Sequence, residues 1–188
     1  MCIRDRLETA VHSIEEELGD RLPDGYVSEV CLALPAWIGE LASALDDGLA
    51  FLFDYGVSRA EYYAAERDGG WLRCHFRHRA HNDPLRLPGI QDITAWVDFT
   101  AVAAAGLESG LDVAGYATQA HFLLHGGLAT ELGHMAGLGL DEQLALSNQV
   151  KTLTLPAEMG EHFKCLGLRR GAIESPAGLA GIDRAAQL

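Results

Sequence analysis

The spacing of apolar positions predicts two helices in the first quarter of the chain. Apolar residues recur at helical spacing between Leu7 and Leu18, and Gly19 follows them as a stop, which predicts a helix over residues 7–18. Pro35 suits the first turn of a second helix, where its missing N–H costs nothing, and Gly48 closes that helix. Between them, residues 25–34 are expected to be extended.

A short apolar run follows the second helix. Leu49 to Phe53 is continuous and apolar, which is typical of a strand buried on both faces. A helix followed by a buried strand favours an α/β fold with a mostly parallel sheet. Asp54 then falls just past the carboxyl end of that strand, at the edge where open α/β sheets bind ligands.

The pattern continues with alternating helices and strands. Ser58 and Glu61 form a capping box that predicts a helix ending near residue 70, and residues 71–76 alternate like a strand. Asp98 is a good N-cap for a helix that Gly106 or Gly110 would close. The remaining elements predicted are a strand over 111–119, a short helix over 120–128, an amphipathic helix over 140–153, a last strand over 160–171 and a loose tail over 172–188.

Composition narrows the class of protein. The 188 residues fit one domain, with 14 Lys and Arg against 27 Asp and Glu, a net charge of −13. This charge argues against nucleic acid and suits a cationic or guanidinium-bearing partner better. No apolar run reaches the ~20 residues of a membrane-spanning helix, so no membrane partner is expected. Four scattered cysteines fit a reducing, cytoplasmic location rather than a disulfide framework.

The stretch over residues 89–102 places carboxylates inside an apolar run. Asp92, Thr94 and Asp98 are interleaved with Trp96 and small or aliphatic residues. Two carboxylates beside an aromatic ring could clamp a guanidinium through charge-assisted hydrogen bonds. The alternatives stay open: a helix cap alone explains Asp98, and a turn after Gly89 explains Asp92.

A histidine cluster raises a metal site as another possibility. His75, His78 and His81 are spaced by three residues near Cys74 and Asp83. In a strand followed by a loop this spacing does not place three imidazoles on one face, so surface or hydrogen-bonded histidines are the preferred interpretation and no metal is expected. The chain also lacks a nucleophile elbow, a phosphate loop and a dinucleotide-binding glycine motif.

Five blocks of the sequence carry a family resemblance: "FLFDYGVSRAEYY", "CHFRHRAHNDP", "PGIQDITAWVDFTA", "GYATQAHFLL" and "LPAEMGEHFKCLGLRRG". In order and spacing, from about Leu22 to Gly171, they resemble the MidA-like methyltransferases, class I enzymes that use S-adenosylmethionine. Where many members of that family carry His, this chain carries Trp96.

The resemblance implies methyl transfer to a protein arginine side chain. The family's mitochondrial relative methylates a subunit of respiratory complex I, so a protein substrate of that kind is the implied partner. Of the residues implied at the site, Asp92 and Asp98 would hold the acceptor, and a carboxylate there can take a proton as general base. The residues implied to line or contact the acceptor pocket are Asp54, Tyr55, Gly56, Thr94 and Gln119.

The resemblance also implies that part of the fold is missing. The family's Glu-x-Gly-x-Gly loop, which holds the cofactor, lies upstream of every block matched here. The expected architecture is therefore the C-terminal portion of a Rossmann-like sheet with flanking helices, over residues 7–171 and without its first strands. Residues 1–6 do not resemble the family and are expected to be a non-native scar. A C-terminal half without the cofactor loop would have no methyltransferase activity on its own. The alternatives are a non-catalytic half-domain that binds a partner protein and a metal enzyme using the histidine cluster.

Overall fold

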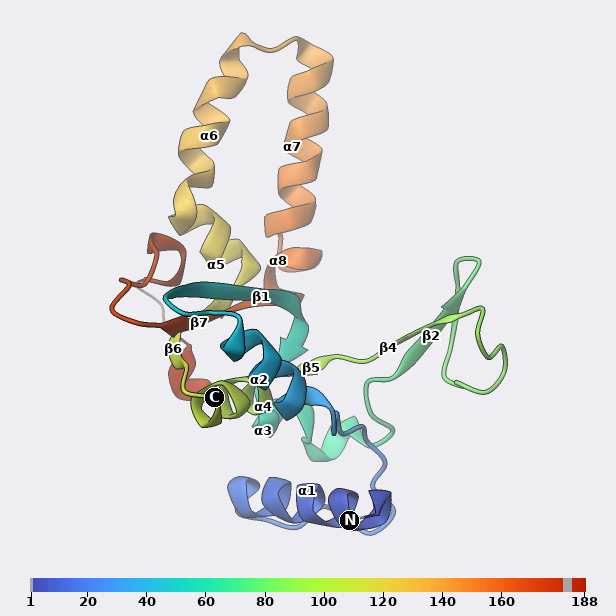
Figure 1. Ribbon diagram of the computed structural model, residues 1–188. Coiled ribbons are helices and arrows are strands. Elements are labelled where there is room, and N and C mark those ends of the chain that lie inside the picture. The colour runs from blue at the N-terminus through green and yellow to red at the C-terminus, as the bar shows by residue number, and fades with distance from the viewer. Residues whose placement is uncertain (1, 181–183) are drawn as a thin grey trace.

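A mixed α/β body with two projecting extensions makes up the chain (Figure 1). The computed structural model describes residues 2–180 and 184–188. The helices and strands are α1 (Ile3–Leu18), α2 (Leu34–Ser43), β1 (Gly48–Val57), α3 (Arg59–Tyr62), β2 (Arg73–Phe76), β3 (Arg79–His81), β4 (Asp92–Thr94), β5 (Val97–Asp98), α4 (Phe99–Glu108), β6 (Asp112–Thr118), α5 (Gln119–Leu123), α6 (Ala129–Gly133), α7 (Leu140–Thr154), α8 (Met159–His162) and β7 (Phe163–Arg170). Single turns of 3₁₀- or π-helix are η1 (Ala65–Arg67), η2 (Leu124–Leu128), η3 (His134–Gly137), η4 (Ala177–Leu179) and η5 (Ala185–Gln187).

The main sheet has the strand order β5-β1-β7-β6. β1 pairs antiparallel with β7 over Gly48–Tyr55, and β7 pairs antiparallel with β6. β5 is parallel to β1 but contacts only Gly56 and Val57. The prediction of a mostly parallel sheet is therefore wrong, because the two long strand pairs are antiparallel.

The expectation for the strand at residues 49–53 is wrong in two respects. β1 continues to Val57, so Asp54 lies within the strand rather than past its end. Phe51 and Phe53 are 39% and 43% exposed, so the strand is not buried on both faces. The edge of β1 facing β5 carries no strand partner from Gly48 to Tyr55 in the part of the chain that the structure describes.

The core lies on both faces of this sheet. On one face α2 and α4 cover β6 and β7, and Ile38, Phe99, Tyr116, Leu166 and Leu168 are all buried there. On the other face Cys165 packs with Ala114, Ala117 and Leu179. Leu179 belongs to the tail expected to be loose; it is 2% exposed, so this part of the tail is packed.

Several helix predictions are confirmed. α1 ends at Gly19, which adopts the left-handed conformation (φ 70°) of a C-cap. Pro35 lies in the first turn of α2. Asp98 caps α4, its side chain accepting a hydrogen bond from the N–H of Ala101 at 3.0 Å. By contrast Ser58 makes no side-chain cap, so the predicted capping box does not form. Residues 26–31 belong to no helix or strand, and Leu34 is already the first residue of α2.

Two extensions leave the body. One is a helical hairpin in which η2, α6 and η3 continue α5 and then return through α7 (Figure 1). The other is a small sheet of order β3-β2-β4 that projects away from the main sheet (Figure 1). None of the described helices is both long and apolar enough to cross a membrane. All four cysteines are free.

Candidate functional site

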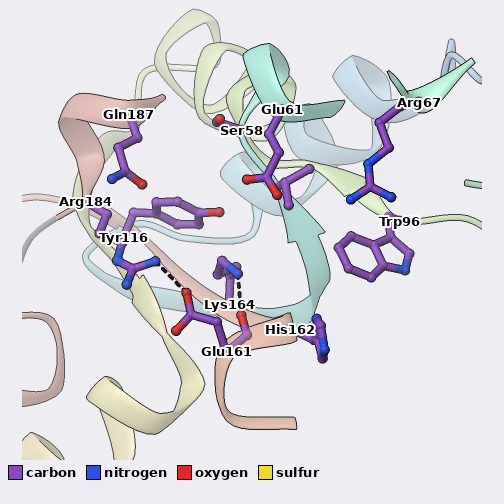
Figure 2. A pocket seen from close by; sticks show the side chains of 11 residues that line it. Ser58, Glu61, Arg67, Trp96, Tyr116, Glu161, His162, Lys164, Arg184 and Gln187 are labelled. Atoms are coloured by element: carbon purple, nitrogen blue, oxygen red, sulfur yellow. Dashed lines mark hydrogen bonds and ion pairs between the residues drawn. The ribbon is translucent and has the colours of Figure 1, made fainter. Parts of the chain in front are cut away.

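A cavity of about 220 Å³ opens at the carboxyl end of β1 (Figure 2). β1 ends there at Val57, α3 contributes Glu61, and Trp96 comes from the segment before β5. The remaining lining side chains come from β6, α8, β7, η1 and the tail, namely Tyr116, Glu161, His162, Lys164, Arg67, Arg184 and Gln187, with Ser58 beside Val57. Polar side chains from segments far apart in the sequence therefore meet at the end of the main sheet where β1 finishes and β7 begins.

Two carboxylates in the cavity have different surroundings. Glu161 pairs with Arg184 of the tail, its Oε1 lying 2.9 Å from the guanidinium Nη1. Glu61 points toward the centre of the cavity (Figure 2), and its carboxylate makes no hydrogen bond or ion pair with any residue the structure describes. Glu61 is therefore the carboxylate available to a ligand.

Lys164 is a buried cation in the cavity floor. It is 7% exposed, and its amino group donates a hydrogen bond to the backbone carbonyl of Glu161. Burial lowers the pKa of Lys164, and the carboxylates of Glu161 and Glu61 partly oppose this shift. Burial also raises the pKa of the neighbouring Tyr116 hydroxyl, which therefore stays protonated at neutral pH.

The lowered pKa of Lys164 predicts a pH dependence of stability. Between the folded pKa and the ordinary value of 10.5, the unfolded chain binds this proton and the folded chain does not, so stability rises with pH in that window. We expect the change in unfolding free energy between neutral pH and about pH 9.5 to favour the folded state less in Lys164→Met than in the parent chain; the cysteines and tyrosines that begin to ionise over this range are the same in both chains. Urea denaturation at both pH values measures this difference. An equal rise in both chains would contradict the prediction.

Trp96 forms the aromatic wall of the cavity. Its ring stacks on that of Trp71 with centroids 4.3 Å apart, and the Arg67 guanidinium lies 4.2 Å from the centroid of the Trp71 ring. The ring of His162 lies edge-on to Trp96. These contacts hold the Trp96 ring in place, where it can stack on a planar cation.

Asp98, one of the two carboxylates predicted to hold the acceptor, forms a buried ion pair. Its Oδ2 lies 3.0 Å from Arg59 Nε, and the two side chains are 9% and 11% exposed. Arg59 also pairs with Glu17 of α1. Burial raises the pKa of Asp98, while Arg59 and the N–H of Ala101 oppose that shift. Its observed contacts thus link the start of α4 to α3 and α1.

The structure does not bring Asp92 and Asp98 into one pocket. Asp92 is exposed on β4 of the small sheet, where it lies opposite His75 of β2. Asp54 is exposed on β1, and its Oδ1 accepts a hydrogen bond from the N–H of Tyr55. A role for Asp54 or Asp92 in acceptor binding remains a prediction.

The other predicted pocket residues divide between two places. The hydroxyl groups of Tyr55 and Thr94 share a hydrogen bond, and the Tyr55 ring lies 6.2 Å from that of Trp96. Neither Tyr55 nor Thr94 lines the cavity itself. Gln119 lies elsewhere: it is 7% exposed, and its amide donates to the Leu153 carbonyl, joining α5 to α7.

Sequence reasoning missed the three charged groups that converge in the cavity. Glu61 was assigned to a helix cap, and Glu161 and Lys164 were assigned only to a strand. One signal was available: in "HFKCLGL" a single lysine interrupts an apolar strand, and buried lysines need a specific environment. The described residues hold no group of three or more His, Cys, Asp or Glu side chains able to bind a metal.

Beside the cavity, a larger groove of about 790 Å³ separates α1 from the body. Trp96 lies on both, and Asp98 and Arg59 line the groove. The groove borders β5, the edge strand of the main sheet. β5 in turn pairs with Gly56 and Val57 at the end of β1.

Comparison with known proteins defines the class. The model of the family described as "Putative S-adenosyl-L-methionine-dependent methyltransferase" matches residues 2–117, and the chain belongs to that family. A curated relative, the mitochondrial "Protein arginine methyltransferase NDUFAF7 homolog" of Drosophila melanogaster, is 31% identical over 140 residues. This match covers 72% of the chain and 30% of the relative. The resemblance to methyltransferases deduced from the sequence is confirmed.

Two crystal structures from Burkholderia thailandensis share the fold. A native structure of an uncharacterized protein is 41% identical, with a TM-score of 0.83 over 87% of this chain and 44% of that one. A second, bound to S-adenosyl-homocysteine, is also 41% identical, with a TM-score of 0.81 over 87% of this chain and 42% of that one. The chain thus spans less than half the length of each of these relatives.

The family uses S-adenosylmethionine, yet the described residues do not form a full cradle for it. Such a cradle needs a glycine loop after a parallel strand, which lets the backbone approach the ligand. Gly56, near the end of β1, instead packs against the Val97 carbonyl and the Phe99 ring. Over residues 2–180 and 184–188, no glycine-rich loop follows either parallel strand of the main sheet.

Proposed function

We propose that this chain is the methyl-acceptor half of an S-adenosylmethionine-dependent protein methyltransferase that acts on arginine. The cavity at the end of β1 would bind the acceptor side chain, and the cofactor would be held by protein lying outside this chain. Bound S-adenosylmethionine supplies a methyl group on a positively charged sulfur. The acceptor half alone is then inactive.

The carboxylate of Glu61 points into the cavity that Trp96 also lines, and it makes no hydrogen bond or ion pair with any described residue; this observation carries the proposal (Figure 2). A guanidinium is planar and cationic, so it can bond Glu61 through paired N–H groups while stacking on an indole. Arginine methylation by the Drosophila relative, as its name states, supports the choice of acceptor.

The open edge of β1 supports the proposal that the chain is one part of a larger sheet. Among the described residues, the ten-residue strand β1 has exposed Phe51 and Phe53 and no strand partner along most of one edge, which favours pairing with a further strand. The same edge would suit the alternative, a non-catalytic half-domain that binds a partner protein by strand addition. For the acceptor protein we propose a subunit of respiratory complex I, on the family resemblance.

Fusion to a cofactor-binding part tests the proposal. The chain would be joined behind the portion of the B. thailandensis relative that it does not match. Transfer of radiolabelled methyl from S-adenosylmethionine to an arginine peptide, and to its lysine counterpart, would then be measured. We expect transfer to the arginine peptide by the fusion and none by the chain alone. A folded fusion that binds S-adenosyl-homocysteine but methylates neither peptide would rule out the acceptor-half assignment.

Glu61→Gln in this fusion should raise KM for the arginine peptide about ten-fold or more, since charge-assisted hydrogen bonds contribute about 1.5–3 kcal/mol. The matched control is Glu66→Gln, because Glu66 is exposed on η1 and does not line the cavity. Equal KM values for Glu61→Gln and the parent fusion would show that Glu61 does not bind the acceptor.

A further inference from the structure

The small sheet carries an unusual charge for this protein. We call residues 73–94, which contain β2, β3 and β4, the basic arm. The arm has two aspartates and four arginines, Arg73, Arg77, Arg79 and Arg86, whereas the chain as a whole has nearly twice as many acidic as basic residues. A basic projection on an acidic protein creates a local positive field. This field attracts acidic partners even though the net charge of the whole protein is negative.

The arginines of the basic arm are available for contacts. All four are exposed, and none forms an ion pair with any residue in the described ranges 2–180 and 184–188. Their side chains make weak or local contacts: Arg73 donates to the neighbouring Leu72 carbonyl, and the Arg77 guanidinium lies 5.3 Å from the Phe76 ring centroid. By contrast, Arg59 and Arg184 of the body are each paired with a carboxylate.

The tip of the arm holds two residues in a conformation that costs energy. β2 and β3 pair from Cys74 to Phe76, leaving Arg77 and His78 as the two-residue turn. Both have positive φ, 47° and 61°, where glycine or asparagine is usual. A non-glycine residue held in the left-handed region costs about 1 kcal/mol or more, and such strain concentrates at functional sites. The turn presents an arginine and a histidine at the tip of the arm.

Apolar side chains lie between these charges. Leu85, Ile90 and Ile93 are 82%, 63% and 54% exposed. Phosphate backbones offer nothing to such residues, whereas an acidic protein segment with interspersed aliphatic side chains would use both kinds of contact. The chemistry of the arm therefore favours a protein segment over nucleic acid.

The base of the arm adjoins the cavity. Trp71 and Trp96, which flank the arm in the sequence, stack on each other, and Trp96 also lines the cavity. We propose that the basic arm binds an acidic segment of a partner protein, with Leu85, Ile90 and Ile93 contacting its aliphatic side chains. Resting on the proposed function, the partner is the methyl-acceptor protein, and the acidic segment flanks the residue that enters the cavity.

Binding of an acidic peptide to the 188-residue chain tests the proposed role of the basic arm, and it needs neither cofactor nor methyl transfer. The probe is a fluorescein-labelled peptide of alternating glutamate and leucine, compared with its lysine–leucine counterpart by fluorescence anisotropy. We expect the acidic peptide to bind, with an affinity that falls as salt is added, and the basic peptide not to bind. Arg77→Glu/Arg79→Glu should weaken binding about ten-fold, from two lost attractions and two new repulsions.

The matched control is Arg4→Glu/Arg21→Glu, which makes the same change in net charge at two exposed arginines of α1 and the turn after it. Its affinity should change less than about two-fold, since charges beyond the Debye length are screened. If both double variants lost the same affinity for the peptide, the loss would follow from net charge alone, and the proposal would be overturned. So would tighter binding of single-stranded RNA or anionic vesicles than of the peptide, or dimerisation lost with the arm variant. Because no methyl transfer is measured, failure of the acceptor-half assignment leaves this result unaffected.

Discussion

Asp98→Ala is expected to lower the free energy of unfolding by about 3–5 kcal/mol, the usual cost of breaking a buried ion pair from one side. The substitution leaves the Arg59 guanidinium, 11% exposed, with only the half-exposed Glu17 as a carboxylate partner. It also removes the cap on α4, because the N–H of Ala101 loses its acceptor. Urea denaturation followed by circular dichroism measures the loss.

Two further variants separate the ion pair from the cap. Asp98→Asn can still accept from Ala101 but carries no charge, so its loss should be smaller than that of Asp98→Ala. In Asp98→Ala/Arg59→Met no buried charge is left unpaired, so the double variant should be more stable than the sum of the single losses predicts. A loss below about 1 kcal/mol for Asp98→Ala would show that only the cap contributes. The contribution of Asp98 to stability would then be local to α4.

The amphipathic helices were predictable because their signals are local. Gly19 ends α1, Pro35 opens α2 and Asp98 caps α4, each through a backbone requirement of that residue type. The helical stretch after β6 is predicted only over residues 120–128. The structure instead continues with a kink at Gly127, where φ is 108°.

The exposure and pairing of β1 could not be predicted from its own residues, because burial is not a local property. The apolar run from Leu49 to Phe53 would suit a strand covered on both faces, and the sequence offered no reason to expect exposed phenylalanines. In the structure Phe51 and Phe53 both contact the ring of Phe122 in edge-on geometry, yet remain partly exposed. The antiparallel β7 lies more than a hundred residues away, and nothing near β1 encodes that pairing.

The candidate site was only partly predictable for a similar reason. Trp96, noted in the sequence, borders the cavity, but Asp54, Tyr55 and Gly56, the residues predicted at the strand end, do not line it. Glu61, Glu161 and Lys164 escaped because each fits an ordinary helix or strand when read alone. Their convergence depends on the pairing of β1 with β7, which brings the start of β7 beside the end of β1.

Leu179→Ala should lower the free energy of unfolding by about 2–5 kcal/mol, as for other buried leucines reduced to alanine. Leu179 is 2% exposed and packs on the face of the sheet opposite α2 and α4. Gly115 of β6 and Gly167 of β7 leave the space that it fills, since a Cβ at Gly115 would lie 2.9 Å from Leu179 Cβ. The substitution leaves a cavity between two strands, because glycines cannot fill it.

Ile173→Ala is the matched control in the same tail. Ile173 is 36% exposed, so its truncation should cost less than about 1 kcal/mol by urea denaturation. The tail also carries Arg184, whose N–H donates to the Tyr116 carbonyl and whose guanidinium pairs with Glu161 in the cavity. If Leu179→Ala only speeds proteolysis of the tail and leaves the unfolding free energy unchanged, Leu179 anchors the tail without supporting the sheet. A loss in the expected range instead makes the tail part of the core that holds the cavity together, because Leu179 then stabilises both β6 and β7.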